Sequence, residues 1–165
     1  MIKKVIKKLG KSAVVFCCGF ALIACEKDDI AEVGKQAPEI ATFDLQGNKA
    51  ELAKWRGKTV LLSFWSETCG VCLAELKELE TWHSQAASDV KLIAINVDGE
   101  KANTQKTVEK RQINQLVLKD QLKITAERYQ VIGTPTSFVI DPNGKILYKF
   151  EGLIPKDKLD ELFKG

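Results

Sequence analysis

One segment constrains the fold more than any other, an apolar run that leads into a pair of cysteines. Residues Thr59–Trp65 are almost continuously apolar, which predicts a central strand buried on both faces. Cys69 and Cys72 follow after a short loop, and Val71–Ser84 then carries apolar residues at helical spacing. The chain is therefore expected to place a two-cysteine motif where a buried strand feeds a helix.

That position favours thiol chemistry. The N-terminus of a helix presents unpaired N–H groups and a positive partial charge, and both stabilise a thiolate. Cys69, at the helix start, would attack a substrate disulfide as a thiolate, and Cys72 would resolve the mixed disulfide. A bridge between them closes so small a loop that it adds less stability than a long-range disulfide. A chemical role is the better interpretation of the pair.

The remaining segments alternate between strand and helix patterns, which predicts an α/β domain with a mixed central sheet flanked by helices. An N-terminal hairpin, Ile40–Leu45 with Lys49–Leu52, is expected to open the domain. Further strands are expected at Val90–Val97, Gln115–Leu118, Thr136–Ile140 and Lys145–Phe150, and further helices at Asn103–Gln112, Lys123–Tyr129 and Lys156–Lys164.

The first residues have the pattern of a secretory leader. A lysine-rich start precedes an apolar run over Ala13–Ala24, which is shorter than the roughly 20 residues needed to span a bilayer. It fits the apolar region of a signal peptide, and Leu22–Cys25 resembles a bacterial lipobox. We therefore expect cleavage before Cys25, lipidation of Cys25 and an extracytoplasmic, lipid-anchored protein in the cell envelope. The alternative is an uncleaved anchor with an incidental cysteine.

This interpretation divides the chain and assigns every cysteine. Cleavage would discard Cys17 and Cys18, lipidation would occupy Cys25, and the folded domain would keep a single possible disulfide. The net charge of +3 also belongs to the leader, because five lysines precede residue 25 and acids outnumber bases in the rest. Without a basic stripe, nucleic-acid binding is not expected. The expected divisions are a signal peptide over 1–24, a lipidated tether over 25–34 and the domain over 35–165.

Metal binding has little support in the sequence. A structural zinc site needs four ligands, but the chain has one CxxC motif and a single histidine, His83. His83 lies eleven residues beyond Cys72 on the same expected helix, about 16 Å away at 1.5 Å per residue. No metal and no other cofactor is expected.

Several motifs together resemble a known family. Phe64-Trp65 before the CxxC, and Gly133-Thr134-Pro135 before a later strand, resemble the thioredoxin superfamily. The opening at 33–38, the segment at 57–60, the extra helix–strand around 103–118 and the turn at 140–145 look like the TlpA/ResA-like branch of extracytoplasmic thiol–disulfide proteins. The resemblance covers about residues 33–164.

The resemblance implies a thioredoxin fold with an N-terminal hairpin and an inserted helix–strand. It also implies a redox-active Cys69–Cys72 disulfide, supported by Trp65, with Pro135 in the cis form beside it. The backbone of Thr134 would pair with an extended client chain. Glu75 matches the acidic residue of the ResA-like proteins; the alternative is an ordinary solvated glutamate in the first helical turn.

Three positions depart from the family pattern. Thr68 stands where many members have Trp, and Ser63 stands where cytoplasmic thioredoxins carry a buried Asp. Gly70-Val71, between the cysteines, matches neither the Gly-Pro nor the Pro-His pair of well-known members. These departures leave the reduction potential and the choice of client open.

The preferred function is a reductase of protein disulfides, with isomerase as a second choice. Glu67 and Glu75 flank the motif, and negative neighbours raise a thiol pKa, which favours the reducing end of the range. By resemblance, electrons would come from a membrane thiol transporter, and apocytochrome c is one possible client. Two alternatives are a peroxiredoxin-like peroxidase, for which Ser66 fits but Leu62 does not, and a Sco-type copper protein, which would need a histidine after Leu118.

Overall fold

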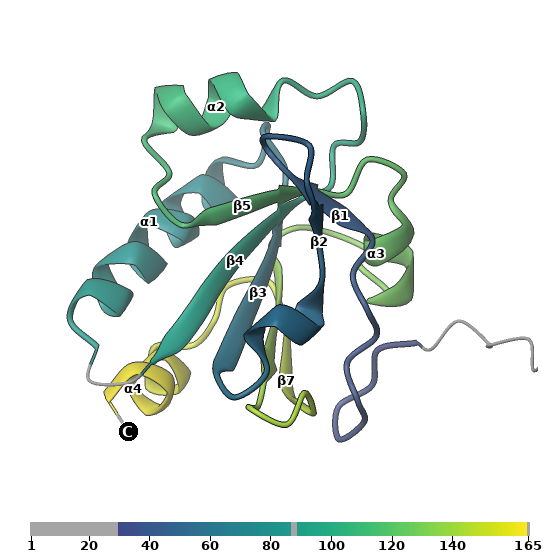
Figure 1. Ribbon diagram of the computed structural model, residues 1–165. Coiled ribbons are helices and arrows are strands. Elements are labelled where there is room, and N and C mark those ends of the chain that lie inside the picture. The colour runs from purple at the N-terminus through teal and green to yellow at the C-terminus, as the bar shows by residue number, and fades with distance from the viewer. Residues whose placement is uncertain (1–29, 87–88, 165) are drawn as a thin grey trace, which may run out of the picture.

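The computed structural model describes residues 30–86 and 89–164, so the expected signal peptide and Cys25 lie outside the described residues. A seven-stranded mixed sheet runs through the molecule in the order β2-β1-β5-β4-β3-β6-β7 (Figure 1). The strands are β1 (Thr42–Asp44), β2 (Lys49–Ala50), β3 (Thr59–Trp65), β4 (Val90–Asn96), β5 (Leu116–Lys119), β6 (Thr136–Ile140) and β7 (Ile146–Glu151). The helices are η1 (Leu52–Trp55), α1 (Gly70–Ser84), α2 (Thr104–Arg111), α3 (Ile124–Arg128) and α4 (Lys156–Lys164).

Strand β3 lies near the middle of the sheet, where the apolar run predicted it. It pairs in parallel with β4 and antiparallel with β6. Successive side chains of a strand point to opposite faces, and both faces of β3 are covered. Leu61 packs in a cluster with residues of α1 and α4, whereas Leu62 and Phe64 pack in the cluster on the other face.

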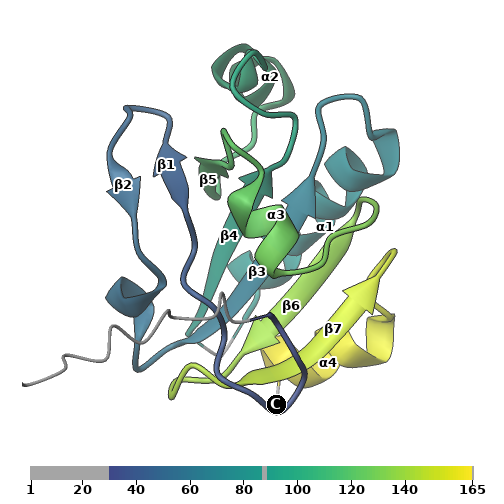
Figure 2. The same cartoon turned by 90° about the vertical axis from the view of Figure 1, so that its right-hand side faces the viewer.

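The helices form a layer on each side of the sheet (Figures 1 and 2). Helices α1 and α4 cover one face, where Leu79 of α1 meets Leu159 and Phe163 of α4. The other face is covered by the N-terminal segment and by the end of α3, where Tyr129 contacts the rings of Phe64 and Phe138. Within the described ranges, no helix has the length and apolarity to cross a bilayer.

The expected elements are present, with differences at their ends. The N-terminal hairpin is confirmed but shorter, because β1 and β2 pair only over Thr42–Asp44 and Lys49–Ala50. Leu52, expected to end a strand, instead begins the 3-10 helix η1. Its buried side chain joins the core, and its N–H donates to the Glu39 carboxylate.

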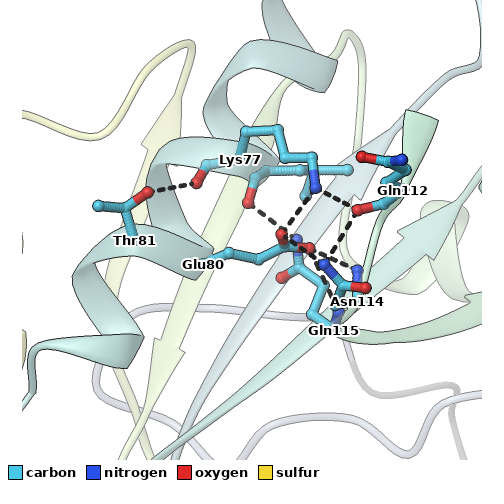
Figure 3. Close-up of polar contacts among 7 residues, drawn as sticks. Lys77, Glu80, Thr81, Gln112, Asn114 and Gln115 are labelled. Carbon is cyan, nitrogen blue, oxygen red and sulfur yellow. Dashed lines mark hydrogen bonds and ion pairs between the residues drawn. The ribbon is translucent and has the colours of Figure 1, made fainter.

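The inserted α2–β5 segment is fastened to α1 through Glu80 (Figure 3). The Glu80 carboxylate accepts hydrogen bonds from the backbone N–H groups of Asn114, at 2.6 Å, and Gln115, at 3.3 Å, and pairs with Lys77 at 2.9 Å. Lys77 also donates to the carbonyl of Gln112, which ends α2. Partial burial acts to raise the pKa of Glu80, but the lysine and the amide donors hold it below its usual value.

The N-terminal segment before β1 belongs to the fold. Ala31 is buried and its N–H donates to the carbonyl of Arg128 at 2.9 Å. Gly34 donates to the carbonyl of Ile146, and the Tyr129 hydroxyl donates to the carbonyl of Pro38 at 2.7 Å. The folded part therefore includes Ala31, ahead of the expected boundary at residue 35.

The Tyr129–Pro38 hydrogen bond gives a stability prediction. Tyr129→Phe removes the hydroxyl and leaves a buried carbonyl without that donor, which should lower the free energy of unfolding by about 1–3 kcal/mol. The matched control is Tyr148→Phe, whose hydroxyl bonds the exposed Glu161, and it should cost less than about 1 kcal/mol. Urea unfolding of the three proteins checks this, and equal losses in the two variants would contradict it.

Candidate active site

Cys69 and Cys72 form a disulfide at the start of α1, with an S–S distance of 2.04 Å. Cys69 is the residue that caps the helix, and its Sγ accepts the N–H of Cys72 at 3.2 Å. The side chain of Cys69 is half-buried, but Cys72 is only 1% exposed and packs against Trp65 and Leu76. The two sulfurs therefore differ in access.

The Thr134–Pro135 loop lies against the disulfide. The peptide bond between these residues is cis, as the resemblance implied. The carbonyl oxygen of Thr134 is 3.7 Å from Cys69 Sγ, although 65 positions separate the two residues in the sequence. A hollow of about 270 Å³ beside the loop is lined by Ile132–Thr136 together with Glu151 and Gly152. The cis-proline loop and the disulfide therefore lie side by side at the site.

A short loop between β7 and α4 connects the two parts of the site. The N–H of Gly152 donates to the carbonyl of Pro135 at 2.8 Å, and the N–H of Ile154 donates to Glu75 Oε1 at 2.8 Å. Glu75 lies on α1, one turn beyond Cys72. The loop is thus bonded to the proline segment at one end and to the cysteine helix at the other.

Glu75 is buried, with 4% of its surface exposed. Desolvation raises the pKa of this carboxyl, the hydrogen bond from Ile154 opposes that rise, and the charge of Glu78 adds to it. The alternative of a solvated first-turn glutamate is therefore wrong. The influence of Glu75 on the thiols stays a prediction.

Two further positions singled out in the sequence lie inside the core. Trp65 ends β3, is fully buried, and packs in the same cluster as Cys72. Ser63 is also buried, and its hydroxyl lies 3.1 Å from that of Ser137 on β6. The site that cytoplasmic thioredoxins fill with an acid is here a neutral hydroxyl pair.

Asp98, just beyond β4, was not expected from the sequence to belong to the site. Its carboxylate contacts Ser66 and the N–H of Glu67, in the loop before Cys69. The sequence nevertheless contained the information needed to place Asp98 near this loop. The segments of β3 and β4 were both expected as buried strands, and parallel neighbours end at the same edge of a sheet. Polar residues after both strands, Ser66 and Asp98, could have been placed together.

The histidine lies away from this site. His83 is exposed near the C-terminal end of α1, whereas the cysteines are at the N-terminal end of that helix. In the part of the chain that the structure describes, no group of three or more His, Cys, Asp or Glu side chains is arranged to hold a metal ion.

Comparisons with known proteins agree with this geometry. The family model described as "AhpC/TSA family" matches residues 33–149. The thiol-disulfide oxidoreductase ResA of Bacillus thuringiensis subsp. konkukian is 32% identical over 139 residues, which are 84% of this chain and 80% of that protein.

Solved structures show the same fold. The crystal structure of a putative thiol:disulfide interchange protein DsbE from Chlorobium tepidum matches with a TM-score of 0.69 and 30% identity, over 77% of this chain and 90% of that chain. The thioredoxin domain of a thiol-disulfide oxidoreductase from Bacteroides vulgatus matches with a TM-score of 0.69 and 26% identity, over 79% and 95% of the chains. Together with the Cys69–Cys72 disulfide, these matches show that the chain belongs to the AhpC/TSA family and, within it, to the ResA-like thiol–disulfide oxidoreductases of thioredoxin fold.

Proposed function

We propose that this oxidoreductase reduces disulfides of proteins in the cell envelope, with Cys69 as nucleophile and Cys72 as resolving thiol. The Cys69 thiolate attacks a client disulfide, which forms a mixed disulfide and releases one client thiolate. Cys72 then attacks Cys69 Sγ, the second client sulfur leaves, and the Cys69–Cys72 disulfide forms. Two electrons pass from the protein to the client in each cycle.

One observation carries the assignment of roles. Cys69 is half-buried at the helix start and Cys72 is almost fully buried behind it. Of the two sulfurs, only that of Cys69 is open to a bulky protein disulfide. It accepts a hydrogen bond from the Cys72 N–H, and the positive end of α1 stabilises negative charge on it. The buried Cys72 sulfur lies next to Cys69 Sγ, which suits an intramolecular attack that releases the client from the mixed disulfide.

The acidic surroundings support the reducing direction. Glu75 is buried close to the cysteine helix start, and Glu67 and Asp98 lie in the loops beside Cys69. Negative charge opposes formation of a thiolate, and oxidants of this fold depend on a strongly stabilised thiolate. A membrane thiol transporter is the proposed electron donor, and apocytochrome c is one proposed client.

A peroxidase fits the site less well. Ser66 occupies the position of the peroxiredoxin Ser/Thr, but its hydroxyl donates to Asp98 at 2.6 Å. Leu62, at the position of the family's proline, is a buried residue in the middle of β3. The copper-binding alternative gains no observation in its favour.

We propose that the lipid anchor holds the domain at the membrane surface, where it acts. Signal cleavage and lipidation of Cys25 would leave five residues before Ile30, where the described chain starts. At about 3.5 Å per residue the anchor would hold the domain within about 20 Å of the bilayer. A short tether of this kind suits exchange with a membrane-bound donor.

Trapping tests the catalytic roles. Cys72→Ala removes the resolving thiol, so mixed disulfides between Cys69 and clients should accumulate in envelope extracts. Cys69→Ala should accumulate few or none, because the remaining thiol is buried. Non-reducing gels with mass spectrometry measure the complexes, and Cys69→Ala/Cys72→Ala is the control. Equal trapping by the two single variants would refute the roles.

Glu75→Gln tests the buried carboxyl. Above its raised pKa the carboxylate is charged and disfavours a neighbouring thiolate, so the neutral amide should lower the pKa of Cys69 or Cys72. Thiols normally titrate near pH 8.5, so the titration is followed through that range. Thiolate absorbance against pH measures it. Glu109→Gln, at an exposed position on α2, is the matched control, and identical curves for all three proteins would exclude the role.

Cys25→Ser tests the anchor. In a bacterial host that processes lipoproteins, this variant should lose its lipid and appear in the soluble envelope fraction. Cys17→Ser changes a leader cysteine that cleavage would remove, so that variant should fractionate like the unchanged protein. Membrane fractionation and intact-mass measurement distinguish the outcomes, and lipid on the Cys25→Ser protein would end the proposal.

A further inference from the structure

Asp98 is exposed, yet its carboxylate accepts three hydrogen bonds. Its Oδ1 accepts the hydroxyl of Ser66 at 2.6 Å, and its Oδ2 accepts the N–H of Glu67 at 2.7 Å. Oδ2 also accepts the Nδ2 amide of Asn96 at 2.7 Å. Two of the three donors belong to the loop that joins β3 to the cysteine helix. One carboxylate therefore bridges the end of β4 to that loop.

Buried polar groups hold Asp98 in place on the side away from the loop. Asn96 and Thr104 are both almost fully buried. Asn96 Oδ1 accepts the N–H of Asp98 at 3.2 Å and the hydroxyl of Thr104 at 3.3 Å. Thr104 is the first residue of α2, so the inserted helix supports Asn96 and Asn96 in turn orients Asp98.

The loop held by Asp98 ends at the attacking cysteine. The carbonyl of Ser66 accepts the N–H of Cys69 at 3.1 Å, and the Ser66 hydroxyl lies 3.2 Å from that of Thr68. Ser66 thus links the carboxylate to the Cys69 backbone through one residue. We propose that Asp98 is a positioning residue for the reaction: through Ser66 and the Glu67 amide, it holds Cys69 in the helix-capping geometry.

The hold matters most in the reduced protein. When the disulfide opens, Cys69 loses its covalent link to Cys72, and the loop is held by hydrogen bonds. Cys69 must still keep its sulfur against the Cys72 N–H and the helix end, because these groups stabilise the thiolate. This inference rests on the proposed role of Cys69 as the nucleophile.

Ser66→Ala tests the positioning separately from charge. It removes the hydroxyl that Asp98 holds but leaves every charged group on the elements around Cys69 in place. Without the Ser66–Asp98 hydrogen bond, Cys69 is held less firmly at the helix end, which stabilises its thiolate. The midpoint pH for alkylation of Cys69 should therefore rise. At pH values below the midpoint, the rate of Cys69 alkylation in Ser66→Ala should be about threefold to tenfold lower than in the unchanged protein. The charged residues that Ser66→Ala leaves in place in the segments around Cys69 are Glu67, Glu75, Asp98, Glu100, Lys101 and Glu151.

The experiment follows iodoacetamide alkylation of Cys69 against pH in the reduced full chain. Ser66→Thr keeps a hydroxyl and should restore the curve. Ser84→Ala makes the same truncation at the far end of α1, and its curve should match that of the unchanged protein. Thermal unfolding is measured in parallel, because a purely structural role would lower the melting temperature without moving the pH profile.

The outcomes are distinct. A midpoint that stays in place in Ser66→Ala, or that moves equally in Ser84→Ala, overturns the inference. If Ser66→Ala does not fold, Asp98→Glu makes the same test, because it keeps the charge and displaces the carboxylate by one methylene. That variant should also raise the midpoint, and an unmoved midpoint would overturn the inference. A protein that shows the shift but reduces no client disulfide would contradict the proposed function and leave the positioning role intact.

Discussion

The backbone of β3 is hydrogen-bonded on both sides, and the geometry of the site depends on that pairing. Its two neighbours each supply a part of the site at the edge where β3 ends. Antiparallel β6 begins directly after Pro135, and parallel β4 ends shortly before Asp98. The cysteine helix leaves from the same edge. Three separate segments therefore meet at Cys69 because they are registered against one buried strand.

The site balances two opposing electrostatic influences. The N-terminus of α1 favours a thiolate on Cys69, and the Cys72 N–H points at its sulfur. The surrounding carboxylates are proposed to oppose it, and an ionised Glu75 would do so with little screening, since its side chain is buried. A couple with this balance gives up electrons more readily than one in which only the helix acts, which is consistent with a reductase.

The sequence predicted those features that depend on local pattern. The apolar run of β3, the helical spacing after Cys72 and the turn before β7 are each encoded within a few neighbouring residues, and the structure has them nearly as expected. The resemblance added the cis form of Pro135, which no local pattern could specify. The burial of Glu75 was left open, because it depends on a loop 79 residues away that supplies the Ile154 amide. Asp98 was missed for the same reason, since two of its partners, Ser66 and Glu67, lie in the loop after a different strand.

The hydrogen bonds that join the loop at 152–154 to the two halves of the site are donated by its main-chain amides. The Gly152 and Ile154 amides make the bonds, while the side chain of Leu153 between them is 56% exposed. Substitution at 153 can therefore change the exposed surface of this loop without removing either hydrogen bond. Main-chain amides are present whatever side chain stands at 153, so the exposed face of the loop can differ in shape and polarity while its attachments to the site persist.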